Sequence, residues 1–94
     1  MGVVPIRPTY INTYRNTVLH RFIEKFLKIF GLNLKIERLK LGLSQEKIAE
    51  SLDFSSVYVS NVESGKHNQV SLVNAYKFAS FYKKSLDYLL TEKS

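Results

Sequence analysis

Four serines recur at short intervals along the C-terminal part of this 94-residue chain, each just ahead of a helix-prone segment. A serine in front of a helix can accept a hydrogen bond from a first-turn N–H that has no partner inside the helix. Apolar residues follow each serine at spacings of three and four, as on one face of a helix. The pattern predicts four short helices that begin after Ser44, Ser55, Ser71 and Ser85.

One of these segments, SSVYVSNVESGK at residues 55–66, also has features of a strand. Val57 and Val59 are two residues apart, as in a strand, whereas Val59 and Val62 are three apart, as in a helix. A strand needs a pairing partner, and no other segment of the sequence offers one. As a helix, the segment buries Val59 and Val62 on one face. The residues that then point mostly away are Ser56, Val57, Ser60 and Asn61.

The turn before this helix is short. The preceding helix, from Ser44 to about Leu52, is separated from it by Asp53, Phe54 and Ser55. Two short helices joined by about three residues must cross at a steep angle, which is the helix-turn-helix arrangement. Ala49 is small where the two helices would meet, and Asp53 tolerates the left-handed conformation that the turn needs better than a branched residue does.

The first third of the chain has a different character. Residues 1–14, with Pro5 and Pro8, show no sustained period and are interpreted as an extended or mobile arm. From about Asn16 to Phe30, apolar side chains fall on one helical face and basic ones on another, which predicts an amphipathic helix. The basic residues of that helix are Arg21, Lys25 and Lys28.

We expect this helix to end at Gly31, because glycine suits the left-handed position that follows a helix. Asn33 can then cap a second helix that runs to about Leu41. The chain is therefore divided into an N-terminal arm and amphipathic helix, residues 1–31, and a helix-turn-helix domain, residues 32–94.

Over about residues 34–90 the sequence resembles the Xre-like, lambda-repressor and Cro-type helix-turn-helix DNA-binding domains. The resemblance rests on three ordered blocks: RLKLGLSQEKIA at 38–49, VSNVESGK at 59–66, and Ala79 followed by SLDYLL at 85–90. It implies an all-α, five-helix domain, to which the N-terminal amphipathic helix is an addition. The chain departs from the family at Asp53 and Lys83, where glycine is common, and in the 66–70 loop, which is one residue longer and lacks the usual proline.

The resemblance implies which residues contact double-stranded DNA. The second helix of the motif enters the major groove in this family, so its exposed residues are candidate base readers. Asn61 can bond adenine, Val57 can lie against a thymine methyl, and Ser56 can serve several bases. Because the helix has no Arg or Lys, the usual guanine contact is missing and an A·T-leaning site is expected. The candidates in and before this helix are Ser55, Ser56, Val57, Tyr58, Ser60 and Asn61.

Other residues are implied to contact the DNA backbone. Gln45 matches a family position that bonds phosphate, and Ser44 beside it adds to an anion site at a helix N-terminus. Lys66 and Asn68 are expected to touch phosphate from the loop. Simple capping at residues 44–45, a solvated loop at residues 66–68 and packing of the Tyr58 ring on the scaffold remain the alternatives. Arg38 and Glu63 match a family ion pair that joins the first helix to the end of the recognition helix.

Composition supports a polyanion partner without specifying one. Fourteen Lys and Arg against eight Asp and Glu give a net charge of +6 and a pI near 9.7. There is no cysteine, and His20 and His67 lie far apart, so no catalytic set, metal site or cofactor site is expected and an enzyme is improbable. The chain shows no export or lipid signal and no membrane span, which favours the cytoplasm.

The chain has more large apolar residues than one small core needs, so we expect a homodimer that binds an inverted-repeat operator and acts as a repressor. The candidate dimer residues are Phe22, Phe26, Phe30, Phe78, Phe81, Tyr82, Leu86 and Leu89. The N-terminal helix has three alternatives: folding back on its own domain, pairing across the dimer, or lying on a membrane, with the first two favoured. The rival function is a protein-interaction module of the same fold, such as an antitoxin or a domain that binds a protein co-regulator.

Overall fold

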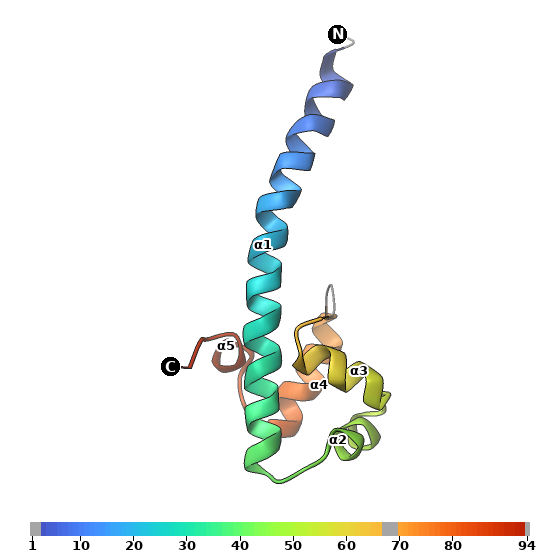
Figure 1. The fold of residues 1–94 in the computed structure, drawn as a ribbon, viewed down its shortest axis with the longest axis vertical. Coiled ribbons are helices and arrows are strands. Elements are labelled where there is room, and N and C mark those ends of the chain that lie inside the picture. Colours follow the sequence, from blue (N-terminus) through green and yellow to red (C-terminus); the bar gives the residue numbers. More distant parts are fainter. Residues whose placement is uncertain (1–2, 67–69, 94) are drawn as a thin grey trace.

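The computed structural model describes residues 3–66 and 70–93 of the chain, and their fold is all-α (Figure 1). No strand occurs in these two segments, so the helical interpretation of residues 55–66 is confirmed. The helices are α1 (Val3–Lys40), α2 (Gln45–Leu52), α3 (Ser56–Glu63), α4 (Leu72–Tyr82) and α5 (Leu86–Leu89).

All four predicted serine caps are confirmed. In each case the serine hydroxyl accepts a hydrogen bond from the backbone N–H three residues later, at 2.9–3.1 Å. The turns that end α2 and α4 use left-handed residues, Asp53 with φ 61° and Lys83 with φ 57°. These are the two positions where the family commonly has glycine, and a side chain there costs the backbone about 1 kcal/mol. Local capping chemistry thus sets the boundaries of the four short helices.

The predicted break at Gly31 is wrong. α1 runs without interruption from Val3 to Lys40, so the additional N-terminal helix and the first helix of the domain are one element that crosses the expected boundary between residues 31 and 32. Gly31 is needed for close packing instead. A Cβ atom built on it would lie 2.2 Å from the carbonyl oxygen of Val62 and 2.7 Å from that of Glu63, at the end of α3.

Asn33 does not cap a helix either. Its side-chain amide donates hydrogen bonds to the carbonyl oxygens of Leu89 and Thr91, at 2.7 and 2.9 Å. Those carbonyls lie at the end of α5 and just beyond it, where a short helix leaves its last acceptors without partners. Buried Asn33 therefore ties the C-terminal segment of the chain to the second half of α1.

Residues 3–14 are helical, which corrects the prediction of an extended arm; residues 1 and 2 lie outside the described residues. Pro5 stands in the first turn of α1, where a missing N–H removes no helical hydrogen bond. Pro8 follows one turn later, and its carbonyl partner, Val4, loses one bond. The remaining residues of α1 continue the helix into the domain.

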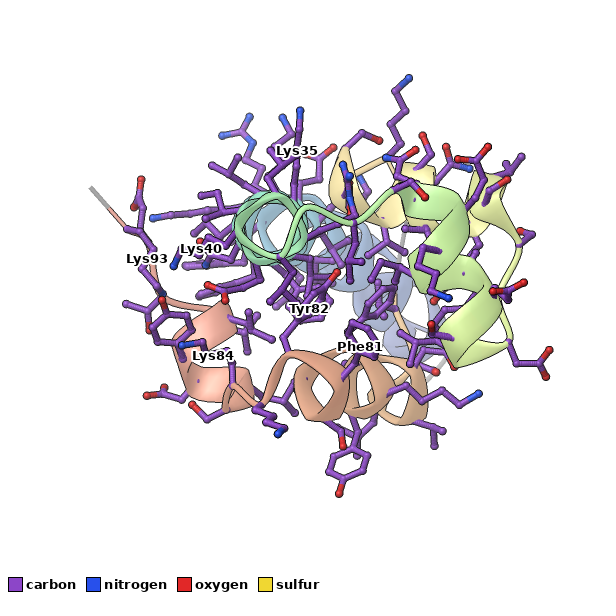
Figure 2. The ribbon with its side chains drawn as sticks, turned by 90° about the horizontal axis from the view of Figure 1, so that it is seen from below. Lys35, Lys40, Phe81, Tyr82, Lys84 and Lys93 are labelled. Atoms are coloured by element: carbon purple, nitrogen blue, oxygen red, sulfur yellow. The ribbon has the colours of Figure 1, made fainter. Side chains whose placement is uncertain are left out.

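The core lies where the second half of α1 meets the other four helices, and in Figure 1 that half passes between α5 on one side and α2, α3 and α4 on the other. Phe30 meets Phe78 edge to face, with ring centroids 6.3 Å apart. Tyr82 lies between α4 and α1 (Figure 2). The buried apolar residues are Phe30, Leu34, Ile48, Ala49, Val59, Val62, Phe78, Ala79, Tyr82 and Leu89.

This core corrects half of the predicted dimer surface. Phe30, Phe78, Tyr82 and Leu89 are each at most 6% exposed inside their own domain, so they are not available to a partner. Phe81 and Leu86 are half-buried against the same core, whereas Phe22 and Phe26 are exposed.

The first half of α1 projects from the domain (Figure 1). The molecule measures 60 × 29 × 18 Å and has a radius of gyration of 16.8 Å, whereas a compact domain of this length would have about 12 Å. The expectation that the N-terminal helix folds back on its own domain is therefore wrong.

None of the helices in the described part of the chain is long and apolar enough to cross a membrane.

Candidate nucleic-acid interface

The recognition helix, α3, is held against the domain by one face only. Val59 and Val62 are buried at 0% and 2% exposure, while Val57 in the first turn is 67% exposed. Ser56 is exposed beside it, and Ser60 and Asn61 are half-buried. The N-terminal half of α3 thus presents two of the predicted base readers, Ser56 and Val57, to solvent, whereas Ser60 and Asn61 in the second half of the helix are only partly exposed.

The turn between α2 and α3 is fixed by backbone hydrogen bonds. The N–H of Asp53 and that of Phe54 both donate to the carbonyl oxygen of Ala49, the latter at 2.8 Å. The hydroxyl of Ser55 then accepts from the N–H of Tyr58 at 3.0 Å and starts α3. Because the small side chain of Ala49 is buried in the core, α2 and α3 can approach closely.

Tyr58 is placed as a scaffold residue. Its ring lies 4.8 Å from that of Phe54, and its hydroxyl accepts a hydrogen bond of 2.9 Å from the side-chain amide of Asn74 in α4. These contacts support the packing alternative for Tyr58. Asn74 was not among the residues predicted from the sequence, because its role depends on a contact between residues sixteen positions apart that no local pattern reveals.

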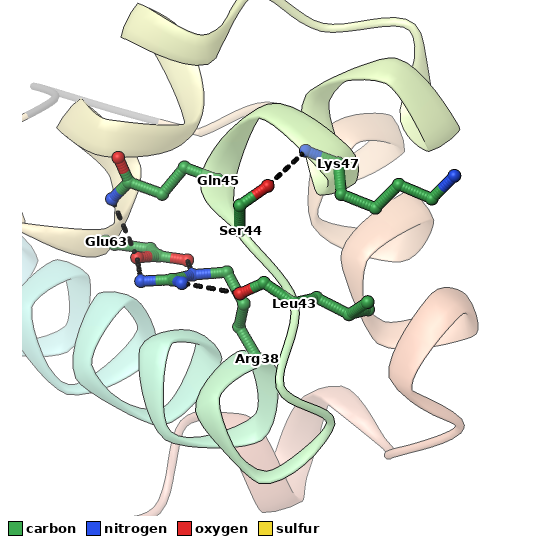
Figure 3. Close-up of polar contacts among 6 residues, drawn as sticks. All are labelled: Arg38, Leu43, Ser44, Gln45, Lys47 and Glu63. Carbon is green, nitrogen blue, oxygen red and sulfur yellow. Dashed lines mark hydrogen bonds and ion pairs between the residues drawn. The ribbon is translucent and has the colours of Figure 1, made fainter.

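The far end of α3 is joined to α1 by a buried ion pair (Figure 3). The structure brings together Arg38 and Glu63, as the resemblance implied, with Nε to Oε2 at 2.8 Å and Nη2 to Oε1 at 3.0 Å. Arg38 Nη1 also donates to the carbonyl oxygen of Leu43, at 2.8 Å. The hydrogen bond to Glu63 raises the pKa of Arg38 above its ordinary value. Through these bonds Arg38 links the end of α3 and the α1–α2 connection to α1.

Gln45 is a third member of this network. Its amide Nε2 donates to Glu63 Oε1 at 3.0 Å, so the side chain lies half-buried at the start of α2 (Figure 3). A side-chain amide carries two N–H groups, and this bond uses one of them. Glu63 therefore fixes the orientation of the Gln45 amide, a link that the sequence did not indicate. Ser44, the other residue predicted to contact phosphate here, caps α2: its hydroxyl accepts a hydrogen bond from the N–H of Lys47.

The loop after α3 lies against α1. A Cβ atom added to Gly65 would come within 2.8 Å of Lys28 Cγ and 3.1 Å of Lys28 Cα. Exposed Lys66 follows directly, and exposed Lys28 begins a basic row that continues with Lys25 and Arg21 toward the N-terminus of α1. Asn68, the other predicted loop residue, lies outside the described residues. The sequence does not indicate the adjacency of Lys28 to the loop, because the predicted division places residues 1–31 in a separate unit.

Tyr82 is the residue of α4 that lies near the charges of Arg38 and Glu63. Burial raises the pKa of its hydroxyl, and the neighbouring charge of Glu63 acts in the same direction. Within the described part of the chain this buried hydroxyl has no hydrogen-bond partner. Tyr82 is therefore a neutral, largely apolar filler beneath the ion pair.

Comparison with known proteins matches residues 34–89, more than half of the chain, to the helix-turn-helix family. Control protein C.MunI from a Mycoplasma species is 44% identical over 52 residues, which cover 54% of this chain and 69% of that protein. The crystal structure of the restriction-modification controller protein C.AhdI from Aeromonas hydrophila is similar, with a TM-score of 0.61 and 38% identity. That match covers 67% of this chain and 94% of the C.AhdI chain.

The matched residues include the α2–α3 turn, the exposed half of α3 and the Arg38–Glu63 pair, while most of the projecting half of α1 lies ahead of them. The chain therefore belongs to the helix-turn-helix family of DNA-binding transcription regulators of the Xre, lambda-repressor and Cro type.

Proposed function

We propose that this protein is a controller of a restriction-modification system, which binds an operator as a homodimer in the cytoplasm and regulates transcription from it. The support is its similarity to two proteins named as controllers, C.MunI and C.AhdI. The observation that carries DNA recognition is the exposed N-terminal half of α3, whose opposite end is held by the buried Arg38–Glu63 pair. A rigidly held helix with small exposed side chains fits the major groove.

Base recognition is assigned to three residues of α3. The Asn61 amide pairs with adenine N6 and N7, the Val57 side chain lies against a thymine methyl, and the Ser56 hydroxyl bonds an adjacent base. α3 contains neither Arg nor Lys, so the operator is expected to be A·T-leaning at these positions. The polar contacts and burial of Tyr58 leave it mainly a support for the other three.

Backbone contacts flank α3. The N-terminus of α2, with the second N–H of Gln45, binds a phosphate on one side, and Lys66 binds one on the other. One α3 reads too few bases for a specific site, so two copies bind an inverted repeat whose half-sites are centred about one helical turn apart. Such a dimer represses when its operator overlaps a promoter and activates when it recruits polymerase beside one.

Selection of binding sites from random DNA, followed by mobility shifts with Asn61→Ala, tests this function. The intact protein should select an inverted repeat, and the variant should bind it with about 1–3 kcal/mol less free energy while binding random DNA as before. Ser51→Ala, on the exposed face of α2, serves as the matched control and should bind like the intact protein.

Equal losses on selected and random DNA would show that Asn61 does not read bases. If the intact protein selected no sequence and left its own upstream DNA unshifted at low salt, the proposed function would fail. A protein-interaction module of the same fold would then be the better account.

A further inference from the structure

Between Val18 and Leu34, α1 carries one apolar stripe, and the domain covers only part of it. Phe30 and Leu34 are buried against the other helices at 3% and 0% exposure. One turn and two turns earlier on the same face, Phe26 and Phe22 are 45% and 57% exposed. The uncovered part of the stripe, here called the α1 apolar face, consists of Val18, Leu19, Phe22, Ile23 and Phe26.

The α1 apolar face continues into a groove on the domain. The groove has a volume of about 380 Å³; Phe22, Ile23 and Phe26 of that face line its α1 side, and residues at the start of α4 and at both ends of α5 line the rest. Leu72 and Leu90 form its outer walls and are themselves exposed, at 75% and 40%. No described segment of the chain covers the groove, so a continuous apolar surface extends from the projecting helix onto the domain.

We propose that this surface is the dimer interface, and that the occupant of each groove and α1 apolar face is the projecting α1 of a second copy. Aromatic side chains bury roughly 150–250 Å² each, so seven half-exposed large apolar residues offer on the order of 600 Å² per copy. A standard stable interface buries about 800 Å² per partner, so one symmetric pairing comes near this amount. Monomeric proteins rarely leave an apolar patch of this size uncovered.

The charges on α1 make this association depend on salt. Arg21 and Lys25 flank the α1 apolar face, where they line a shallow hollow together with Val18 and Phe22, so pairing through this face brings like charges close together. A two-fold axis places the same surface on both partners, so the α1 apolar face and groove of one copy meet those of the other. Added salt screens the repulsion, so dimerisation should strengthen with salt. The affinity for DNA should instead fall as the salt concentration rises.

The inference rests on the homodimer of the proposed function and names its interface. Because association is measured without DNA, failure of the interface can be distinguished from failure of operator binding. The test is analytical ultracentrifugation of the full chain, the double variant Phe22→Ser/Phe26→Ser, and the control Leu39→Ser/Leu41→Ser. Leu39, in the last turn of α1, and Leu41, just beyond its end, are each 57% exposed, so the control removes similar apolar area elsewhere.

The intact chain should sediment as a dimer whose dissociation constant falls as salt rises. The Phe22/Phe26 variant should raise that constant at least about 100-fold, because each substitution acts twice in a symmetric interface. The control should stay close to the intact chain. A monomeric intact chain at every concentration and salt, or a control that dissociates as much as the variant, would overturn the proposal.

Cross-linking keeps the test decisive if the double variant loses its fold. The chain contains no cysteine, so Ile23→Cys introduces a single thiol in the middle of the α1 apolar face. A short bis-maleimide should link two copies at Ile23→Cys and not at Leu41→Cys. The reverse result would overturn the interface, as would a monomeric intact chain that binds anionic vesicles through Phe22 and Phe26.

Discussion

At the scale of single residues, Glu63 connects three helices, α1, α2 and α3. Its carboxylate accepts hydrogen bonds from Arg38 of α1 and from Gln45 of α2, and it is itself the last residue of α3. The backbone carbonyl of Glu63 lies against Gly31. One side chain therefore fixes the end of the recognition helix and the amide nearest to the expected phosphate.

Glu63→Gln should lower the free energy of unfolding by about 3 kcal/mol, because the buried guanidinium of Arg38 loses its countercharge. Denaturation in urea measures the change. Glu46→Gln, at an exposed position of α2, should change stability by no more than about 0.5 kcal/mol. The double variant Arg38→Met/Glu63→Leu should recover much of the loss, since no charge is then left buried alone. A Glu63→Gln protein as stable as the parent would show that the pair is not needed to hold the fold.

At the scale of helices, local signals determine where α2, α3, α4 and α5 begin, whereas packing against α3 determines that α1 continues through Gly31. α2, α3, α4 and α5 begin at serine caps, and α2 and α4 end at left-handed residues, all of which are local signals. In the sequence Gly31 resembles a signal that ends a helix, but in the structure α1 continues through it. It remains helical because α3 packs too close to the helix for any side chain.

Gly31→Ala distinguishes these two roles. In an ordinary helix this change stabilises a protein by up to about 1 kcal/mol. Here the new methyl would lie 2.2 Å from the Val62 carbonyl oxygen, so we expect a net loss of about 1–3 kcal/mol in the free energy of unfolding, measured in urea. Leu32→Ala, at the neighbouring exposed position, should be nearly neutral. A stabilised Gly31→Ala protein would mean that α1 and α3 do not approach this closely.

The sequence was sufficient to predict local features, such as helix caps and buried helix faces. It was insufficient to predict contacts between residues that lie far apart along the chain. Val59 and Val62 could be predicted as buried and Val57 as exposed from helical spacing alone, once Ser55 was taken as a cap. The bonds from Asn33 to the end of α5, and from Asn74 to Tyr58, join residues 56 and 16 positions apart. No periodicity encodes such pairs, so the continuity of α1 and the supporting role of Tyr58 emerged only from the fold.

At the scale of the whole molecule, positive charge is concentrated on α1. Residues 1–31 contain five basic residues and one acidic residue, a net charge of +4, whereas residues 32–94 contain nine and seven, a net charge of +2. Because Lys28 lies beside the loop that carries Lys66, the basic row of α1 extends the side of the domain that we propose to bind phosphate. The proposed dimer and DNA contacts would thus use adjacent faces of one helix.

Lys25→Gln/Lys28→Gln tests whether this row reaches DNA. Each phosphate contact contributes about 0.9 to the slope of log K against log salt, so losing two should reduce the slope by roughly 2. Affinity should fall by a similar factor on operator and on random DNA, because phosphate contacts do not read sequence. Lys83→Gln/Lys84→Gln removes the same charge where α4 ends, away from the Lys28–Gly65 contact, and should leave the slope nearly unchanged. Equal slopes for both variants would restrict the backbone contacts to the loop and the start of α2. A larger loss on the operator alone would mean that α1 positions α3 rather than binding phosphate itself.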